Sequence, residues 1–142
     1  MGAPAKTTFA TLSDWSVNPD AGIKYYSGTA VYTKTVEVDA ARLGGKVWLD
    51  LGDVENIAEV KVNGRDCGLV WKTPFRFDIT AAVKAGANEI EVKITNMWVN
   101  RLIGDVQPGA TQYARTSQQS YQPNAPLRPS GLIGPVQICS EK

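Results

Sequence analysis

The most informative absence in this 142-residue chain is histidine, which does not occur at all. Histidine is the commonest general base near neutral pH and a frequent metal ligand. Its absence excludes Ser-His-Asp and Cys-His relays and every metal site that needs an imidazole. Catalysis would have to rest on carboxylates, lysine or tyrosine, or on a site supplied by another polypeptide.

Cysteine is almost as scarce, since the chain has only Cys67 and Cys139. The two could form a disulfide in an oxidising compartment, but a single pair in a domain of this size is more often two buried thiols. The sequence leaves their pairing open.

Strong charge and long apolar runs are also missing. Fifteen basic and fourteen acidic residues give a net charge of +1 and are scattered without blocks, so nothing favours nucleic acid or a membrane surface as a partner. No apolar run approaches the ~20 residues of a membrane helix. The start, MGAPAKTTF, lacks the basic and apolar regions of a signal peptide. The length suits one domain with a substantial core.

The chain does contain many short segments in which apolar and polar residues alternate, the pattern of half-buried strands. Asn63-Gly64 stands between two of them, and both residues tolerate the positive φ of a type I′ hairpin turn. A short helical turn is expected after Thr80. The segments expected to be strands are 29–38, 46–51, 59–62, 67–71, 75–79, 88–95 and 136–138.

About eight strands with turn signals every 8–12 residues predict an all-β sandwich. The turns alone do not distinguish a jelly roll from an immunoglobulin-like sandwich. We expect a single sandwich domain over 22–142, preceded by an N-terminal extension or first strand region over 1–21. Polar residues without apolar period fill 100–128, and such long loops are usually functional or disordered.

Acidic residues give little support for catalysis or metal binding. Glu89 and Glu91 share one strand face about 7 Å apart, but that face is the polar side of an amphipathic strand, which favours solvated surface charges. Asp50, Asp53 and Glu55 could hold calcium through oxygen ligands, yet they lack EF-hand spacing and turn chemistry explains them equally well. We therefore assign no catalytic residue and no metal ligand.

Aromatic residues beside hydrogen-bond donors give a better signal. Aromatic faces stack on the C–H surfaces of sugars, while amide and guanidinium groups bind hydroxyl pairs. Packing in the core or at its rim is the alternative for the two tryptophans. The candidate carbohydrate-binding residues at strand ends are Trp71, Lys72, Arg76, Trp98, Asn100 and Arg101.

These segments together carry a family resemblance. YSGTAVYTKTVEV, VKVNGRDCGLVWKTPFRFDIT, AGANEIEVKITNMWVNRLIGD and PSGLIGPVQI follow one another in that order between residues 22 and 138. This order resembles the sugar-binding β-sandwich of glycoside hydrolase family 2, and more closely the C-terminal sandwich of family 106 α-L-rhamnosidases.

The resemblance implies a galactose-binding-like jelly roll that is ancillary to a catalytic barrel, with the catalytic carboxylates in the barrel. In such enzymes the loop before the last strand leans toward the barrel, and the matching region here is 100–128. Asp105, the only acid in that loop, becomes a further candidate near a sugar or ion.

Several expectations follow from the resemblance. The partners are a carbohydrate and the catalytic domain of a glycoside hydrolase, and the location is periplasmic or secreted. No cofactor is expected, while a structural calcium ion stays open. The alternative function is a protein-interaction module that binds no sugar itself.

Overall fold

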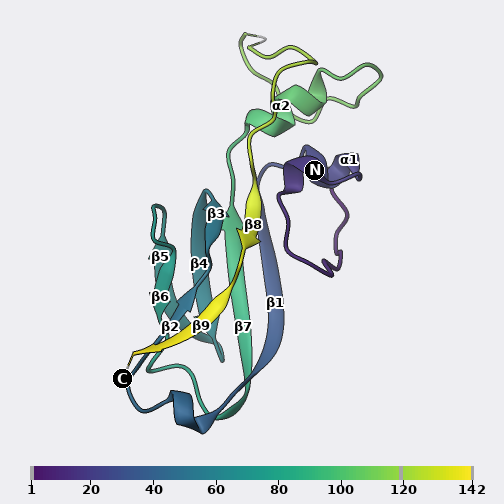
Figure 1. Cartoon of the computed structure of the whole chain (residues 1–142). Helices are drawn as coiled ribbons and strands as arrows, with labels where there is room; N and C mark the ends of the chain where they lie inside the picture. The colour runs from purple at the N-terminus through teal and green to yellow at the C-terminus, as the bar shows by residue number, and fades with distance from the viewer. Residues whose placement is uncertain (1, 119, 142) are drawn as a thin grey trace.

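The computed structural model describes residues 2–118 and 120–141 and shows a β-sandwich of antiparallel ladders (Figure 1). One sheet has the strand order β1-β7-β4-β5 and the sheet packed against it has the order β6-β2-β9, while β3 pairs with β8. The strands are β1 Thr29–Val38, β2 Lys46–Asp50, β3 Asp53–Glu55, β4 Ile57–Val62, β5 Arg65–Val70, β6 Arg76–Asp78, β7 Gly86–Thr95, β8 Gly131–Gly134 and β9 Gln137–Glu141. The predicted all-β sandwich is confirmed.

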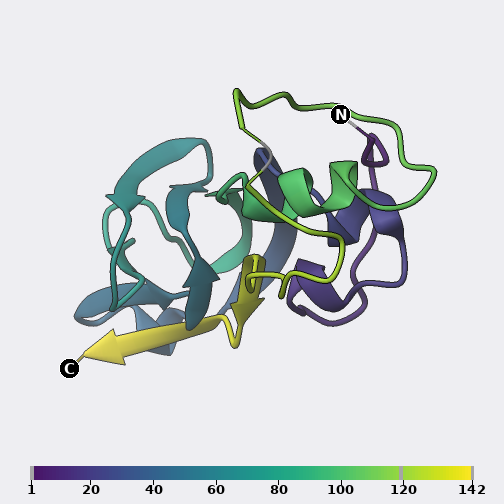
Figure 2. The same cartoon turned by 90° about the horizontal axis from the view of Figure 1, so that it is seen from above.

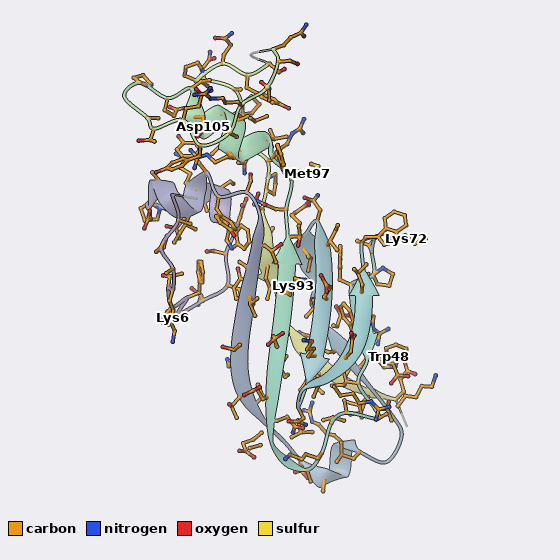
Figure 3. All side chains as sticks on the ribbon, turned by 180° about the vertical axis from the view of Figure 1, so that it is seen from behind. Lys6, Trp48, Lys72, Lys93, Met97 and Asp105 are labelled. Carbon is orange, nitrogen blue, oxygen red and sulfur yellow. The ribbon has the colours of Figure 1, made fainter. Side chains whose placement is uncertain are left out.

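The four-stranded sheet separates its apolar and polar residues as the alternation predicts. Val60 and Val92 face each other across β4 and β7 and are buried in the core. On the outer face, Lys93 pairs with Glu59 at 2.8 Å, in the middle of the sheet in Figure 3. Glu91 on the same face pairs with a lysine and Glu89 is exposed, which fits solvated surface charges.

The Asn63-Gly64 turn has the geometry that the sequence predicts. Asn63 has φ 51° and Gly64 φ 78°, the left-handed conformation that a type I′ turn requires. The Asn63 amide also donates to Asn88 Oδ1 at 2.8 Å and to the Ala82 carbonyl at 2.9 Å. The hairpin is therefore tied to the connection that leads into β7.

The helical turn expected after Thr80 is a single turn, in which the Val83 amide donates to the Ile79 carbonyl. Longer helices occur elsewhere: α1 covers Ala21–Lys24 and α2 covers Val99–Asp105, with 3-10 turns at Trp15–Val17 (η1) and Ala40–Arg42 (η2). The loop expected over 100–128 thus begins as helix α2. Seven residues are too few for a helical period to stand out in the sequence.

Residues 1–21 were expected to be an extension or a first strand; within the described part of this region Trp15 is in the core, and Phe9 and Leu12 pack against it. Trp15 is buried, and its indole Nε1 donates to the Tyr32 hydroxyl at 2.6 Å. Burial raises the pKa of the Tyr32 hydroxyl. Residues 3–10 form an arch beside β1, and Figure 2 shows α1 next to α2 at one end of the sandwich.

Two further expectations concern thiols and membranes. Cys67 and Cys139 are free thiols, half-buried rather than buried as the sequence favoured, and burial raises the pKa of Cys67. Within 2–118 and 120–141, the structure contains no helix with the length and apolar character to cross a membrane.

A change of pH tests the turn after β6. The Thr80 hydroxyl and amide donate to Asp78 Oδ1 at 2.6 and 3.0 Å and lower the pKa of this carboxyl below its ordinary 3.8. A lowered folded-state pKa gives stability that is present above the unfolded pKa and is lost as the pH falls through the folded pKa. We expect Asp78→Asn to be less stable than the wild type at pH 6, and this gap to narrow as the pH falls below the ordinary carboxyl pKa of 3.8.

Urea denaturation at a series of pH values measures this difference. Asp66→Asn is the control, because Asp66 is also exposed and accepts a bond from the Gly68 amide but receives none from a hydroxyl. A stability gap between Asp78→Asn and wild type that stays constant from pH 6 to about pH 3 would contradict the assignment.

Candidate functional site

Exposed aromatic and apolar side chains gather at the end of the sandwich from which α2 rises, here called the loop end. Trp71 follows β5 and Trp98 precedes α2, and each side chain is 67% exposed. Figure 3 shows their neighbours Lys72 and Met97 at this same end. The sequence left packing in the core or at its rim as the alternative, and these exposures exclude packing in the core.

Lys72 adds a cationic group to the loop end. Its Nζ lies 5.8 Å from the centroid of the Trp71 ring, and the residue is exposed. A cation–π contact in water contributes only about 0.5–1 kcal/mol. The lysine can therefore leave the ring when a ligand stacks on it.

Arg76 is not brought to the loop end. Its guanidinium lies 5.2 Å from the ring of Trp48 on the outer face of the three-stranded sheet, and its Nε lies 3.5 Å from Asp50 Oδ2. Trp48 is labelled in Figure 3, well away from Lys72. The structure thus separates Arg76 from Trp71, although only four residues lie between them in the sequence.

Asn100 is a structural clamp within the loop. It is 1% exposed, its amide donates to the Arg128 carbonyl at 2.7 Å and to Ser130 Oγ at 3.0 Å, and its Oδ1 accepts from the Arg128 amide at 2.8 Å. All three hydrogen bonds join the two ends of the loop. It presents no surface to a ligand in this conformation.

Arg101 and Asp105 fold the loop back onto α2. Their Nε and Oδ1 atoms lie 2.8 Å apart, and the two side chains are 12% and 2% exposed. Asp105 Oδ2 accepts from the amides of Tyr113 and Ala114 at 3.0 and 2.6 Å, and Arg101 lies over the Tyr113 ring. Asp105 also borders a hollow of about 430 Å³ between α2 and the loop.

Ser130 is the centre of a buried polar network that sequence reasoning missed. Its hydroxyl oxygen accepts from the side-chain amides of Asn96 and Asn100 at 3.2 and 3.0 Å, and its own amide donates to Asp14 Oδ1 at 2.9 Å. Asn96, Asn100 and Ser130 are all buried. No local pattern marks this network, because its members come from three separate segments of the chain, at Asp14, 96–100 and Ser130.

The acidic group considered for calcium fits turn chemistry better than metal binding. Asp50 Oδ1 accepts from the Gly52 amide at 2.9 Å, and Glu55 accepts from the Asn56 side chain. Within the described ranges, 2–118 and 120–141, no three or more Cys, Asp or Glu side chains gather closely enough to hold a metal ion.

The loop end can therefore bind a flat or apolar partner on a framework that is already ordered. Trp71 and Trp98 offer aromatic faces, Lys72 offers an ammonium group, and the Asn100 clamp with the Arg101–Asp105 ion pair fixes α2. A preformed framework reduces the conformational entropy that binding costs.

Comparisons with known proteins identify relatives of this sandwich. A family model described as glycosyl hydrolase 2 galactose-binding domain-like matches residues 15–127. A Formosa agariphila protein provisionally named a beta-glucuronidase is 53% identical over 102 residues, which are 70% of this chain and 9% of that protein.

Solved structures give the same relationship. A rhamnosidase from Novosphingobium sp. PP1Y superposes with a TM-score of 0.93 at 47% identity, over 96% of this chain and 13% of that one. A Ruminococcus gnavus beta-glucuronidase gives a TM-score of 0.58 at 26% identity, over 66% of this chain and 17% of that one. The chain thus spans less than a fifth of the length of these relatives. It belongs to the glycosyl hydrolase 2 galactose-binding domain-like family, and its sandwich is a galactose-binding-like domain of glycoside hydrolases.

Proposed function

We propose that this chain is a non-catalytic carbohydrate-binding domain that supports or lines the active site of a catalytic barrel not contained in residues 1–142. The observation that carries the proposal is the pair of tryptophans at the loop end, each 67% exposed. Indole rings bury a large apolar area when they stack, and leaving two of them in water is typical of a binding surface.

The candidate residues divide into two groups. Trp71, Lys72 and Trp98 are the residues that we expect to touch the ligand, since they are exposed at the loop end. Asn100, Arg101 and Asp105 act by positioning, because they hold α2 and the loop. Arg76 lies on the outer face of the other sheet and is left out of the proposed contact surface.

The partners follow from the family and the surface. We propose a carbohydrate with rhamnose or galactose units as the ligand, and the catalytic domain of a glycoside hydrolase as the protein neighbour. The family analogy favours a periplasmic or secreted parent protein. Fractionation of the source cells, followed by immunodetection of this domain, tests the location, and detection only in the cytoplasm would contradict it.

Calorimetric titration of rhamnose- and galactose-containing oligosaccharides tests the binding. We expect Trp71→Ala and Trp98→Ala each to weaken binding by about two- to tenfold, because one stacking contact is worth about 0.5–1.5 kcal/mol. Trp48→Ala is the matched control, since it removes a tryptophan from the outer face of the other sheet and should leave the affinity unchanged. Circular dichroism confirms that each variant is folded.

Two results would overturn the sugar-binding proposal. One is an absence of heat together with unchanged indole NMR signals of Trp71 and Trp98 across the oligosaccharide series. The other is an affinity that falls as much in Trp48→Ala as in the two loop-end variants.

The second candidate function is a protein-interaction module without sugar binding. It is favoured by Met97, which precedes Trp98 in the chain and is 50% exposed, and so adds apolar surface beside the Trp98 ring. Calorimetry with the purified catalytic region distinguishes the two functions. Binding of that region but of no oligosaccharide, with loss in Met97→Ser, would support the interaction module.

A further inference from the structure

Strand β1 is an edge strand of the four-stranded sheet, and it lies beyond the edge of the opposing sheet β6-β2-β9. Inward apolar residues on the central strands, such as Val60 and Ile94, are buried, whereas Tyr32 and Val36 on β1 are only half-buried. The four-stranded sheet has one strand more than the sheet β6-β2-β9, and β5 lies against β6 at the far side. In the part of the chain that the structure describes, much of the inner face of β1 therefore has no strand opposite it.

The space beneath β1 is a groove of about 820 Å³. Val36 lines it from β1 and Ile138 from β9, while Leu49 and Val92 of the core form its floor. The arch over residues 3–10 spans its open side, with Lys6 at the outer part of the arch in Figure 3. Core side chains are thus open to the groove.

Both walls of the groove are sheet edges. Among the described strands, β1 pairs only with β7 and β9 pairs only with β2, so each has one side without a strand ladder. Free amide and carbonyl groups on such an edge are a template for one more strand. Arg42 donates to the Ile138 carbonyl at 3.0 Å, which occupies one of these groups with an exposed, displaceable side chain.

The charged side chains that line the groove are both positive. Lys6 and Lys34 line it, and Lys34 points to the inner face because its partner on β7 is the buried Ile90. No aspartate or glutamate is among the lining residues within the described ranges. An acidic side chain on the occupant would complement these amines, whereas two copies of this groove would bring like charges together.

We propose that the groove receives one additional β-strand, supplied by polypeptide outside residues 1–142. This strand pairs with the free edge of β9 and lies opposite β1, so that both sheets have four strands. It carries apolar residues at alternate positions and one acidic residue that faces Lys34. A helix uses its backbone amide and carbonyl groups within itself and could not pair with the free edge of β9, whereas a strand can.

The proposal is independent of sugar binding. It agrees with the finding that such domains occur within much longer chains, of which this chain spans 13% in the rhamnosidase and 17% in a beta-glucuronidase.

Hydrogen exchange on a fusion protein tests the proposal. A nine-residue strand of alternating valine and threonine, with glutamate in place of the central valine, is joined to the N-terminus through a flexible Gly-Ser linker. The linker keeps the strand at an effective concentration of about millimolar. We expect the backbone amides of β1 and β9 to exchange about tenfold more slowly than in a fusion that carries the linker alone.

Charge reversal makes the test specific. Lys34→Glu should abolish the protection, and replacing the glutamate of the fused strand by lysine should restore it. Val31→Glu is the matched control, because Val31 is on the same strand but faces outward opposite Lys93. This variant should keep the protection.

Three outcomes would overturn the proposal: equal exchange with the strand and with the linker alone, protection confined to segments other than β1 and β9, or insensitivity to Lys34→Glu. Sedimentation of the unfused chain adds a fourth. A dimer with protected β9 amides would identify a second copy as the occupant and would contradict a strand from outside the chain.

Discussion

Replacing Asn100 by leucine is expected to lower the free energy of unfolding by about 2–4 kcal/mol. The leucine has the same branching and the same number of side-chain heavy atoms but removes three hydrogen bonds, two to the Arg128 backbone and one to Ser130 Oγ. Each lost hydrogen bond costs about 0.5–1.5 kcal/mol, and three of them account for the expected loss, while Ser130 Oγ keeps its bond from the Asn96 amide. Because the clamp joins the two ends of the loop, its loss should also release α2.

Urea denaturation measures the loss of stability, and proteolysis within 106–128 measures the release of the loop. Asn124→Leu is the matched control: this asparagine belongs to the same loop but is exposed, so its replacement should change stability by no more than about 0.5 kcal/mol. Equal effects of the two variants, or a loop that stays resistant to protease in Asn100→Leu, would contradict the clamp.

The same variant separates positioning from contact in the proposed sugar site. If Asn100 acts by holding α2, then Asn100→Leu should weaken oligosaccharide binding through greater loop mobility, and a disulfide that ties the loop ends should restore it. A direct ligand would not be rescued in this way. Asn100 was chosen from the sequence as a ligand-binding residue, and its burial is what changes its role.

The strands could be predicted because their signal is local. Alternation at every second residue places Ile90, Val92 and Ile94 on one face, and the structure buries all three. The Asn63-Gly64 turn is equally local, since its two positive φ angles depend on the residues themselves. Interactions between residues close in the sequence are enough to predict these elements, without knowledge of tertiary contacts.

The loop end could be predicted only in part, because its organisation depends on contacts between distant segments. Trp71 and Trp98 were identified, but whether a tryptophan near a strand end packs inside or stays exposed depends on neighbours that the local sequence does not specify. Arg76 was placed with Trp71 by proximity in the chain. Its partner across the ladder is Asp50, which turns the guanidinium to the outer face of the other sheet.

Gly131 should be among the positions least tolerant of substitution, and Gly131→Ala is expected to cost about 2–5 kcal/mol. The residue has φ +95°, a conformation that disfavours any side chain. A Cβ at this position would also overlap the Trp15 indole, which is buried and donates to the Tyr32 hydroxyl. The alanine must therefore push Trp15 out of the core or move β8 away from it.

Gly109→Ala separates the two contributions to this cost. Gly109 has φ +73°, but a Cβ at this position would have no atom within 4 Å. Its replacement by alanine therefore costs only the backbone strain, about 1 kcal/mol. Urea denaturation gives the two losses, and the indole NMR signal of Trp15 reports its bond to Tyr32. We expect that signal to shift only in Gly131→Ala. Equal losses of stability in the two variants, with an unchanged Trp15 signal, would show that backbone conformation rather than close packing against Trp15 requires glycine where the last strands begin.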